Sequence, residues 1–306
     1  MTGTAETGPG HGQDGQRRAF DLPDGRRVGA LLAGPADGRP LVLHNGTPGG
    51  LVVWPGTVEA ARARGLRTIL VARPGYGGST PLPGRRVANV AGDVAAVLDA
   101  LGCGAFVTVG SSGGGPHALA CSALLRDRCL GAATLAGVAP YQAGGMDFLA
   151  GMGPENIEEF RAAIDGEAAL TAFLSREAGG LRAVQGPQVA AELGGLVSEA
   201  DRAVLAGGYA DHLAASLRSA VSGGIAGWRD DDLAFVSDWG FPLASAGPVA
   251  IWQGDRDLMV PPAHGSWLAG HIPGARARLC RDEGHLTLQA NRFGEVLDDL
   301  IGLAGR

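Results

Sequence analysis

Residues 105–119 read Ala-Phe-Val-Thr-Val-Gly-Ser-Ser-Gly-Gly-Gly-Pro-His-Ala-Leu. A β-branched apolar run stops here at a glycine, and two serines and three more glycines lead into a segment rich in alanine and leucine. Within it, Gly110-Ser111-Ser112-Gly113-Gly114 fits G-x-S-x-G, a pattern typical of a strand–turn–helix that carries a serine nucleophile. Such a turn needs glycine two residues before and after the serine, and it places the Ser112 hydroxyl at a helix N-terminus. Because glycine is frequent in this chain, the interpretation depends on the surrounding sequence.

From residue 40 to residue 140 the chain alternates between short apolar runs and helical patterns. This alternation predicts βα repeats, and therefore an α/β fold with a mainly parallel, doubly wound sheet and helices on both faces. A hairpin is expected before it, because Asp24-Gly25 separates two strand-like runs at 17–22 and 26–33.

The strand pattern stops after residue 140. Helical patterns follow one another, and Ser198-x-x-Asp201 resembles a capping box at the start of one of them. Strand-like runs return at 248–252 and 275–280, and a closing helix is expected at 291–303. We therefore expect an α/β core of residues 17–140 and 241–306, a helical cap inserted at 141–240, and a disordered tail of residues 1–16.

Two loops after the insertion contain the partners that a serine nucleophile needs, namely a histidine base and a carboxylate that orients it. Asp257 follows the strand expected at 248–252, and His285 follows the one expected at 275–280. Both lie where parallel strands end, and the order Ser, Asp, His is that of sheet enzymes with this serine turn. Asp255 is a rival candidate for the acid.

The turn Asn45-Gly46-Thr47-Pro48-Gly49, after the first parallel strand, predicts an oxyanion hole. A tetrahedral intermediate needs N–H donors aimed at its oxyanion. The backbone N–H of Gly113, directly after the serine, is one candidate, and that of Thr47 is the other. His44 and His117 are expected near this site as packing or hydrogen-bonding residues rather than as a second base.

Together these segments resemble the serine α/β-hydrolases over about residues 20–140 and 245–300. The resemblance rests on Asn-Gly-Thr-Pro-Gly (45–49), Arg-Pro-Gly-Tyr-Gly-Gly-Ser (73–79), Gly-Ser-Ser-Gly-Gly-Gly-Pro-His-Ala-Leu-Ala (110–120), Gly-Asp-Arg-Asp-x-x-Val-Pro (254–261) and Gly-His (284–285).

The resemblance implies an α/β-hydrolase fold in which Ser112 is the nucleophile, Asp257 the acid and His285 the base, with Thr47 and Gly113 as oxyanion donors. The chain departs from the family at Asn45, where histidine is more frequent, and at Ser111, where a bulky residue is frequent. Neither departure affects the triad, but both leave the substrate open.

Composition excludes several other function classes. The net charge of −6 gives no indication of nucleic acid or an anionic membrane as a partner. All 25 basic residues are arginine, which excludes chemistry that needs lysine, such as a Schiff base or a Walker phosphate loop. The absence of lysine also suggests a bacterial gene. The cysteines (Cys103, Cys121, Cys129 and Cys280) have no metal-site spacing and are expected as free thiols of a cytoplasmic protein.

The sequence lacks the motifs that a dinucleotide cofactor or a metal would need. Gly113-x-Gly115-x-x-Ala118 matches a dinucleotide fingerprint, but the strand that follows ends at 136–140 without the acidic residue that this fingerprint requires. No metal motif is present, no apolar stretch is long enough to span a membrane, and residues 1–16 lack the apolar centre of a signal peptide. We expect no cofactor and no metal.

The sequence therefore predicts a carboxylic ester hydrolase that cleaves an ester, lactone or thioester of a mostly apolar small molecule through an acyl-enzyme on Ser112. A non-hydrolytic enzyme of the same fold, such as a cyclase or lyase, or a ligand-binding protein is the alternative. No arginine cluster indicates an anionic substrate, so an uncharged acyl or alcohol group is expected. The candidates for lining the substrate pocket are Tyr141, Met146, Phe148, Met152, Trp228 and Trp239.

Overall fold

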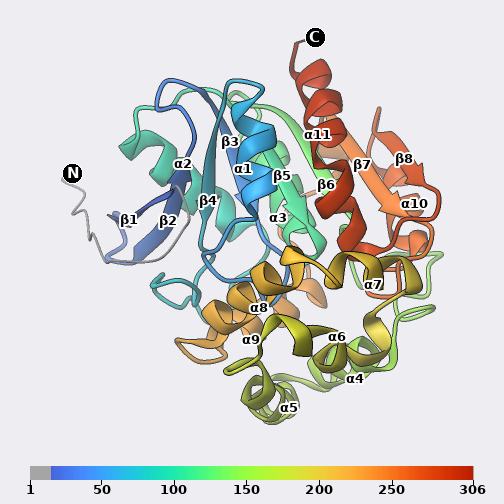
Figure 1. The fold of residues 1–306 in the computed structure, drawn as a ribbon. Helices are drawn as coiled ribbons and strands as arrows, with labels where there is room; N and C mark the ends of the chain where they lie inside the picture. The colour runs from blue at the N-terminus through green and yellow to red at the C-terminus, as the bar shows by residue number, and fades with distance from the viewer. Residues whose placement is uncertain (1–14, 306) are drawn as a thin grey trace.

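One eight-stranded sheet organises the fold, and the computed structural model describes it together with its helices over residues 15–305 (Figure 1). The strands lie in the order β1-β2-β4-β3-β5-β6-β7-β8. β2 pairs antiparallel with both β1 and β4, whereas the pairs from β4 and β3 through to β8 are parallel. The strands are β1 Gly15–Asp21, β2 Arg27–Ala33, β3 Arg39–His44, β4 Leu66–Val71, β5 Phe106–Ser111, β6 Cys129–Leu135, β7 Val249–Gly254 and β8 Arg276–Cys280.

Helices cover both faces of this sheet, which is why its central strands are apolar on both sides. Leu41 and Leu43 of β3 pack with α1 and α11, whereas Val42 packs on the opposite face with α2. α3 covers that second face further along, and α10 lies on it against β7. These helices are α1 Pro55–Arg62, α2 Asn89–Ala100, α3 Gly115–Leu124, α10 Pro262–His271 and α11 His285–Ala304.

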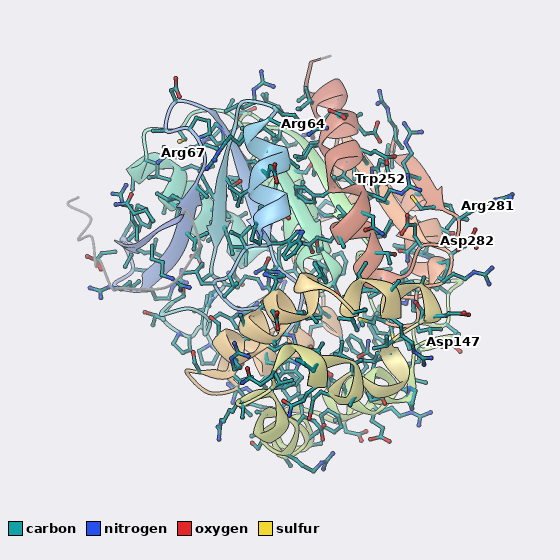
Figure 2. All side chains as sticks on the ribbon, viewed as in Figure 1. Arg64, Arg67, Asp147, Trp252, Arg281 and Asp282 are labelled. Atoms are coloured by element: carbon teal, nitrogen blue, oxygen red, sulfur yellow. The ribbon has the colours of Figure 1, made fainter. Side chains whose placement is uncertain are left out.

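A surface ion pair joins the two helices on the first face. Arg64, just after α1, donates to both oxygens of Asp298 on α11 at 2.7 Å, and Figure 2 shows Arg64 beside these helices. Because Asp298 is exposed, the pair contributes little to the free energy of folding compared with the apolar contacts beneath it.

Between β6 and β7 the chain forms a group of helices, residues 154–235, that we call the cap. Figure 1 shows them gathered below the strands, beside the first turn of α11. The helices are α4 Pro154–Asp165, α5 Glu167–Leu181, α6 Val189–Glu192, α7 Glu199–Leu205, α8 Gly208–Val221 and α9 Ala226–Phe235. Within residues 15–305, no helix combines the length and apolarity that a membrane span requires.

The predicted fold class is confirmed, since the sheet is mainly parallel and covered by helices on both faces. Two boundaries differ from the sequence expectations. Gly15 and Gln16, assigned to the tail, begin β1 and pair with β2, and the remainder of that tail lies outside the described residues. The closing helix already begins at His285 rather than at 291, because a carboxylate from the cap holds its first turn, as described below.

Candidate active site

Ser112 lies in the sharp turn between β5 and α3. Its φ is +54°, in the left-handed region that residues other than glycine rarely adopt. A Cβ at Gly110 would overlap the carbonyl oxygen of Gly114, and one at Gly114 would overlap that of His44. Glycine is therefore required on both sides, and the strained turn directs the serine into a cavity between the sheet and the cap.

His285 and Asp257 meet at the same edge of the sheet. The imidazole Nδ1 lies 2.8 Å from Oδ2 of Asp257, whose side chain is buried. The other carboxylate oxygen accepts the backbone N–H groups of Met259 and Val260 at 2.9 and 2.8 Å. These two bonds fix the carboxylate in the loop after β7, so that it faces the imidazole.

Asp255 has a different role from that of its neighbour. Its carboxylate accepts the backbone N–H of Asp282 at 2.8 Å and so ties the loop after β7 to the loop after β8. Ser112 and His285 both line the cavity, although the contacts of these two described residues include no hydrogen bond between them. Catalytic hydrogen bonds are often long before substrate binds.

Two carboxylates act on the basicity of His285. Burial alone would lower the pKa of the imidazole, but the charge and hydrogen bond of Asp257, with a smaller contribution from Asp201, raise that pKa above its ordinary value. A neighbouring carboxylate of this kind favours the imidazolium that forms when histidine takes a proton.

The two residues expected to supply oxyanion donors lie against each other. A Cβ at Gly113 would overlap the hydroxyl oxygen of Thr47 and approach its Cβ to 2.9 Å. Thr47, Gly113 and Ser112 also line one recess of the cavity. The loop that contains Thr47 is held from within, since the Asn45 side chain donates to the carbonyl oxygens of Gly50 and Val52.

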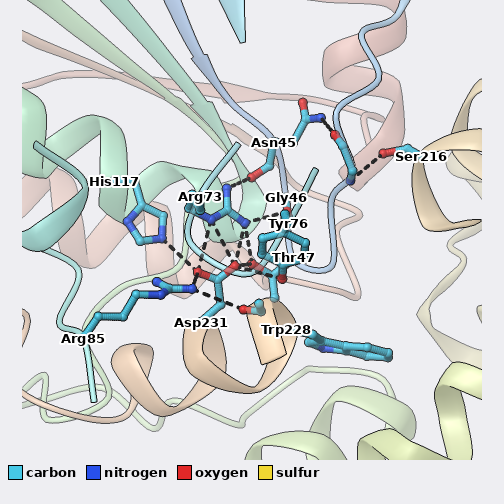
Figure 3. Close-up of polar contacts among 12 residues, drawn as sticks. Asn45, Gly46, Thr47, Arg73, Tyr76, Arg85, His117, Ser216, Trp228 and Asp231 are labelled. Carbon is cyan, nitrogen blue, oxygen red and sulfur yellow. Dashed lines mark hydrogen bonds and ion pairs between the residues drawn. The ribbon is translucent and has the colours of Figure 1, made fainter. Parts of the chain in front are cut away.

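Arg73 also holds this loop (Figure 3). Its guanidinium donates to the carbonyl oxygens of Asn45 and Gly46 at 2.6 and 2.9 Å and to the Thr47 hydroxyl at 3.0 Å. The same guanidinium pairs with Asp231 at 2.6 Å. The conformation of the loop therefore depends on a buried ion pair with the cap.

Asp231, on α9, is the centre of this cluster. Its carboxylate pairs with Arg73 and with Arg85, the latter at 2.7 Å, and accepts the hydroxyl groups of Thr47 and Tyr76. Burial alone would raise the pKa of Asp231, but the two guanidinium groups hold it well below its ordinary value. A fully buried carboxylate is tolerated here because it is paired and hydrogen-bonded.

The two histidines near the site are buried, which lowers the pKa of each. His117 lies 3.3 Å from Asp231, and burial lowers its pKa to about 4. Burial also lowers the pKa of His44, which packs beside Cys121. Their surroundings agree with the packing roles expected from the sequence and leave His285 as the basic group that faces the cavity.

Asp201 connects the cap to the catalytic histidine candidate. This fully buried residue of α7 accepts the backbone N–H groups of His285, Leu286 and Thr287 at 3.1, 2.7 and 3.2 Å. The Ser198 hydroxyl donates to it at 2.7 Å. A cap side chain thus takes the N-cap role for α11, satisfying N–H groups that a helix leaves unpaired and fixing the residue at its first position.

The cavity encloses about 210 Å³ and lies between the sheet edge and the cap. Of the residues proposed from the sequence to bind substrate, Trp228 lines it. The other five lie elsewhere, packed in or against the apolar cluster that joins α3, β7 and α10: Tyr141, Met146, Phe148, Met152 and Trp239. Most of the large apolar residues expected to line the pocket therefore pack against the core and not against the cavity.

Two important residues were missed by sequence reasoning. Asp231 belongs to the run Asp230-Asp231-Asp232, which normally indicates a solvated helix face. Asp201 was noted as part of a capping box for its own helix. The Ser198 hydroxyl does accept the backbone N–H of Asp201 at 3.2 Å, but the Asp201 carboxylate accepts N–H groups of α11. Its contact with α11 depends on folding and has no local signal.

Comparisons with known proteins agree with this fold. A family model described as alpha/beta hydrolase fold matches residues 39–288. Epoxide hydrolase B of Mycobacterium tuberculosis is 32% identical over 112 residues, which are 35% of this chain and 32% of that protein. A non-heme chloroperoxidase of Streptomyces lividans is 33% identical over 143 residues, 46% of this chain and 52% of that protein. The match therefore spans between a third and about half of these relatives.

Solved structures match over nearly the whole chain. A bromoperoxidase from Bacillus anthracis has a TM-score of 0.65 at 23% identity, covering 94% of this chain and 99% of that one. An esterase from Rhodococcus sp. has a TM-score of 0.63 at 21% identity, covering 95% and 100%. An enol-lactonase from Burkholderia xenovorans has a TM-score of 0.62 at 21% identity, covering 93% and 99%. At this identity the likeness concerns the fold.

Proposed function

Because the chain belongs to the α/β-hydrolase family, we propose that it is a serine hydrolase of the carboxylic ester class. It cleaves an ester, lactone or thioester of a mostly apolar small molecule through an acyl-enzyme on Ser112. One observation supports this above the others: the strained serine turn and the Asp257–His285 pair open onto one cavity.

The chemistry follows from the positions of these groups. Nε2 of His285 takes the proton of the Ser112 hydroxyl as the serine oxygen attacks the acyl carbon, and Asp257 stabilises the imidazolium that forms. The oxyanion accepts the backbone N–H groups of Thr47 and Gly113. The imidazolium then protonates the leaving alcohol or thiol, and water, activated by the same histidine, cleaves the acyl-enzyme.

The cavity lining supports an apolar substrate body. Leucines from the cap and the sheet edge surround the serine, together with the aromatic residues Phe173, Tyr209 and Trp228. Such a lining favours a hydrocarbon chain or ring over an extended polar one. The esterase and enol-lactonase named above share the fold, and the range of chemistry in their names is why the scissile bond is proposed only as a class.

The test is a panel of esters, lactones and thioesters with acyl chains of varied length, assayed with the wild-type protein and with Ser112→Ala. We expect turnover of at least one class and a loss on the order of 10⁴–10⁶ in kcat for the variant. Turnover above about 1% of wild type in Ser112→Ala would contradict the acyl-enzyme. A protein that binds panel members without turning any over would support the alternative of a non-hydrolytic enzyme or a ligand-binding protein.

A further inference from the structure

The cavity wall formed by the cap is acidic. Four glutamates line it, and no arginine does so among the residues that the structure describes: Glu155, Glu159, Glu177 and Glu192. The chain as a whole has 25 basic and 31 acidic residues. This nearly balanced composition does not explain why one wall has four glutamates and no arginine. His212, which also lines the wall, adds no positive charge near neutral pH because burial lowers its pKa to about 4.

Helix stability does not explain this arrangement. Glu155 and Glu159 lie four residues apart on α4, so they share one face of the helix, where like charges are unfavourable. Glu155 in the first turn is favoured by the helix dipole, but Glu159 lies beyond it. Both side chains are only partly exposed and both face the cavity. Their desolvation therefore needs another explanation.

A buried acid behind Glu159 provides a second, independent observation. Asp232 is 1% exposed, and no N–H group of the described residues donates to its Oδ2. Asp232 lines the recess beside Ser112, and Glu159 lines both that recess and the larger cavity. One oxygen of Glu155 is likewise buried without a donor, while its other oxygen accepts the backbone N–H of Gly195.

The acids of this wall have few donors, and the exposed Glu177 pairs with Arg176 at 2.9 Å. Glu159 accepts the indole N–H of Trp228 at 2.7 Å. Burial raises the pKa of Glu159. Burial and the neighbouring Glu159 raise the pKa of Asp232 well above its ordinary value, whereas the hydrogen bond with Asp232 lowers the pKa of Glu159. The indole of Trp228 is the N–H donor to this pair of carboxyl groups, and a protonated amine would supply further donors together with a positive charge.

We propose that the substrate of this site has an apolar body and a protonated amine, which binds between Glu155 and Glu159 with Asp232 behind them. The exposed carboxylates of Glu177 and Glu192 stand at the mouth and attract the cation before it binds. The proposal deepens the proposed function by naming a substrate class for the same site. It replaces the uncharged group expected from the sequence with a cationic one and keeps the apolar body.

Two matched measurements test the proposal. The first compares kcat/KM for 4-nitrophenyl 6-aminohexanoate, its neutral counterpart 4-nitrophenyl heptanoate, and the anionic 4-nitrophenyl monoester of adipic acid. We expect the amine ester to exceed the neutral ester by about tenfold or more and the anionic ester to be poorest, since one charge-assisted hydrogen bond is of this size. Added salt should reduce the preference, because the glutamates at the mouth are exposed.

Glu159→Gln should reduce the ratio of amine to neutral ester by about fivefold or more, since the amide retains an acceptor for Trp228 but loses the charge. Glu158→Gln is the matched control: this exposed neighbour on the same helix does not line the cavity and should leave the ratio unchanged. A Glu159→Gln protein that loses stability yet retains the wild-type ratio would assign this carboxyl to holding Trp228 in the cap, and the proposal would be wrong.

The second measurement separates this proposal from the hydrolase itself. Calorimetry compares the binding of hexylammonium, 1-hexanol and hexanoate to the wild-type protein, with no reaction needed. Tighter binding of hexylammonium, lost in Glu159→Gln, supports the amine site even if no ester is hydrolysed. A different result would contradict the amine site but not the proposed hydrolase. In that result the protein hydrolyses the amine and neutral esters equally well and binds hexylammonium and hexanol equally tightly.

Discussion

Asp201→Asn tests how far the cap controls the catalytic histidine candidate. The amide retains one oxygen, which is able to accept the N–H groups of Leu286 and Thr287 as Oδ1 does now. It loses the second oxygen, which accepts the N–H of His285 and the Ser198 hydroxyl. Loss of hydrogen bonds to a buried charged group at a helix N-terminus costs about 2 kcal/mol of unfolding free energy.

Asp201→Asn should also change the pH dependence of kcat/KM for ester hydrolysis. Asp201 contributes to raising the pKa of His285, so its neutralisation lowers that pKa. The imidazole must be neutral to accept the serine proton, and activity is lost as pH falls through its pKa. The acid limb of the kcat/KM profile should therefore move to lower pH in Asp201→Asn.

The assays are urea unfolding and a pH profile of ester hydrolysis from about pH 4 to 9. Ser198→Ala is the control, because it removes the hydrogen bonds of the Ser198 hydroxyl with the carboxylate and the backbone N–H of Asp201 but retains the charge. We expect it to lower stability by about 1 kcal/mol and to leave the acid limb in place. An acid limb that is identical in Asp201→Asn and wild type, or an unfolding free energy within about 0.5 kcal/mol of wild type, would refute the reasoning.

Three further predictions concern the ion-pair cluster of Asp231, the expected oxyanion hole at Gly113, and the tryptophans of the core and the cavity. Asp231→Asn should lower the unfolding free energy by about 3–5 kcal/mol in urea unfolding, since it leaves two buried guanidinium groups without their counter-charge; a loss under 1 kcal/mol would contradict this. Gly113→Ala should reduce kcat by about 10²-fold or more, because its Cβ overlaps Thr47 in the expected oxyanion hole, and unchanged kinetics would remove that hole from the account. Trp239→Ala should cost about 3–5 kcal/mol in the same unfolding assay with little change in substrate preference, whereas Trp228→Ala should change the preference; the reverse pattern would be inconsistent with the cavity described.

Features encoded within a few residues were predictable from the sequence. The alternation of apolar runs and helical patterns predicted the mainly parallel sheet, because each βα unit has a local signature. The glycines around Ser112 predicted a tight turn for the same reason, and the structure gives that serine a positive φ. The proximity of Asp257 and His285 was predictable because the carboxyl ends of parallel strands meet at one edge, whatever lies between them in the chain.

Features that depend on how the cap packs were not predictable. Asp201 and Asp231 are acidic residues on cap helices, and a local reading assigns such residues to solvent. Each is buried by a partner far away in the sequence, α11 for the first and the Arg73 motif for the second. The cavity lining was missed for a related reason, since apolar character alone does not separate residues that line a cavity from those, such as Phe148, that fill the core beneath it.

The covalent intermediate is the most direct test of the account. Wild-type protein treated with a fluorophosphonate probe and measured by intact mass should gain one adduct, and peptide mapping should locate the adduct at Ser112. The same treatment should leave Ser112→Ala unmodified. An adduct on another residue, or undiminished labelling of Ser112→Ala, would contradict a serine nucleophile in the turn between β5 and α3.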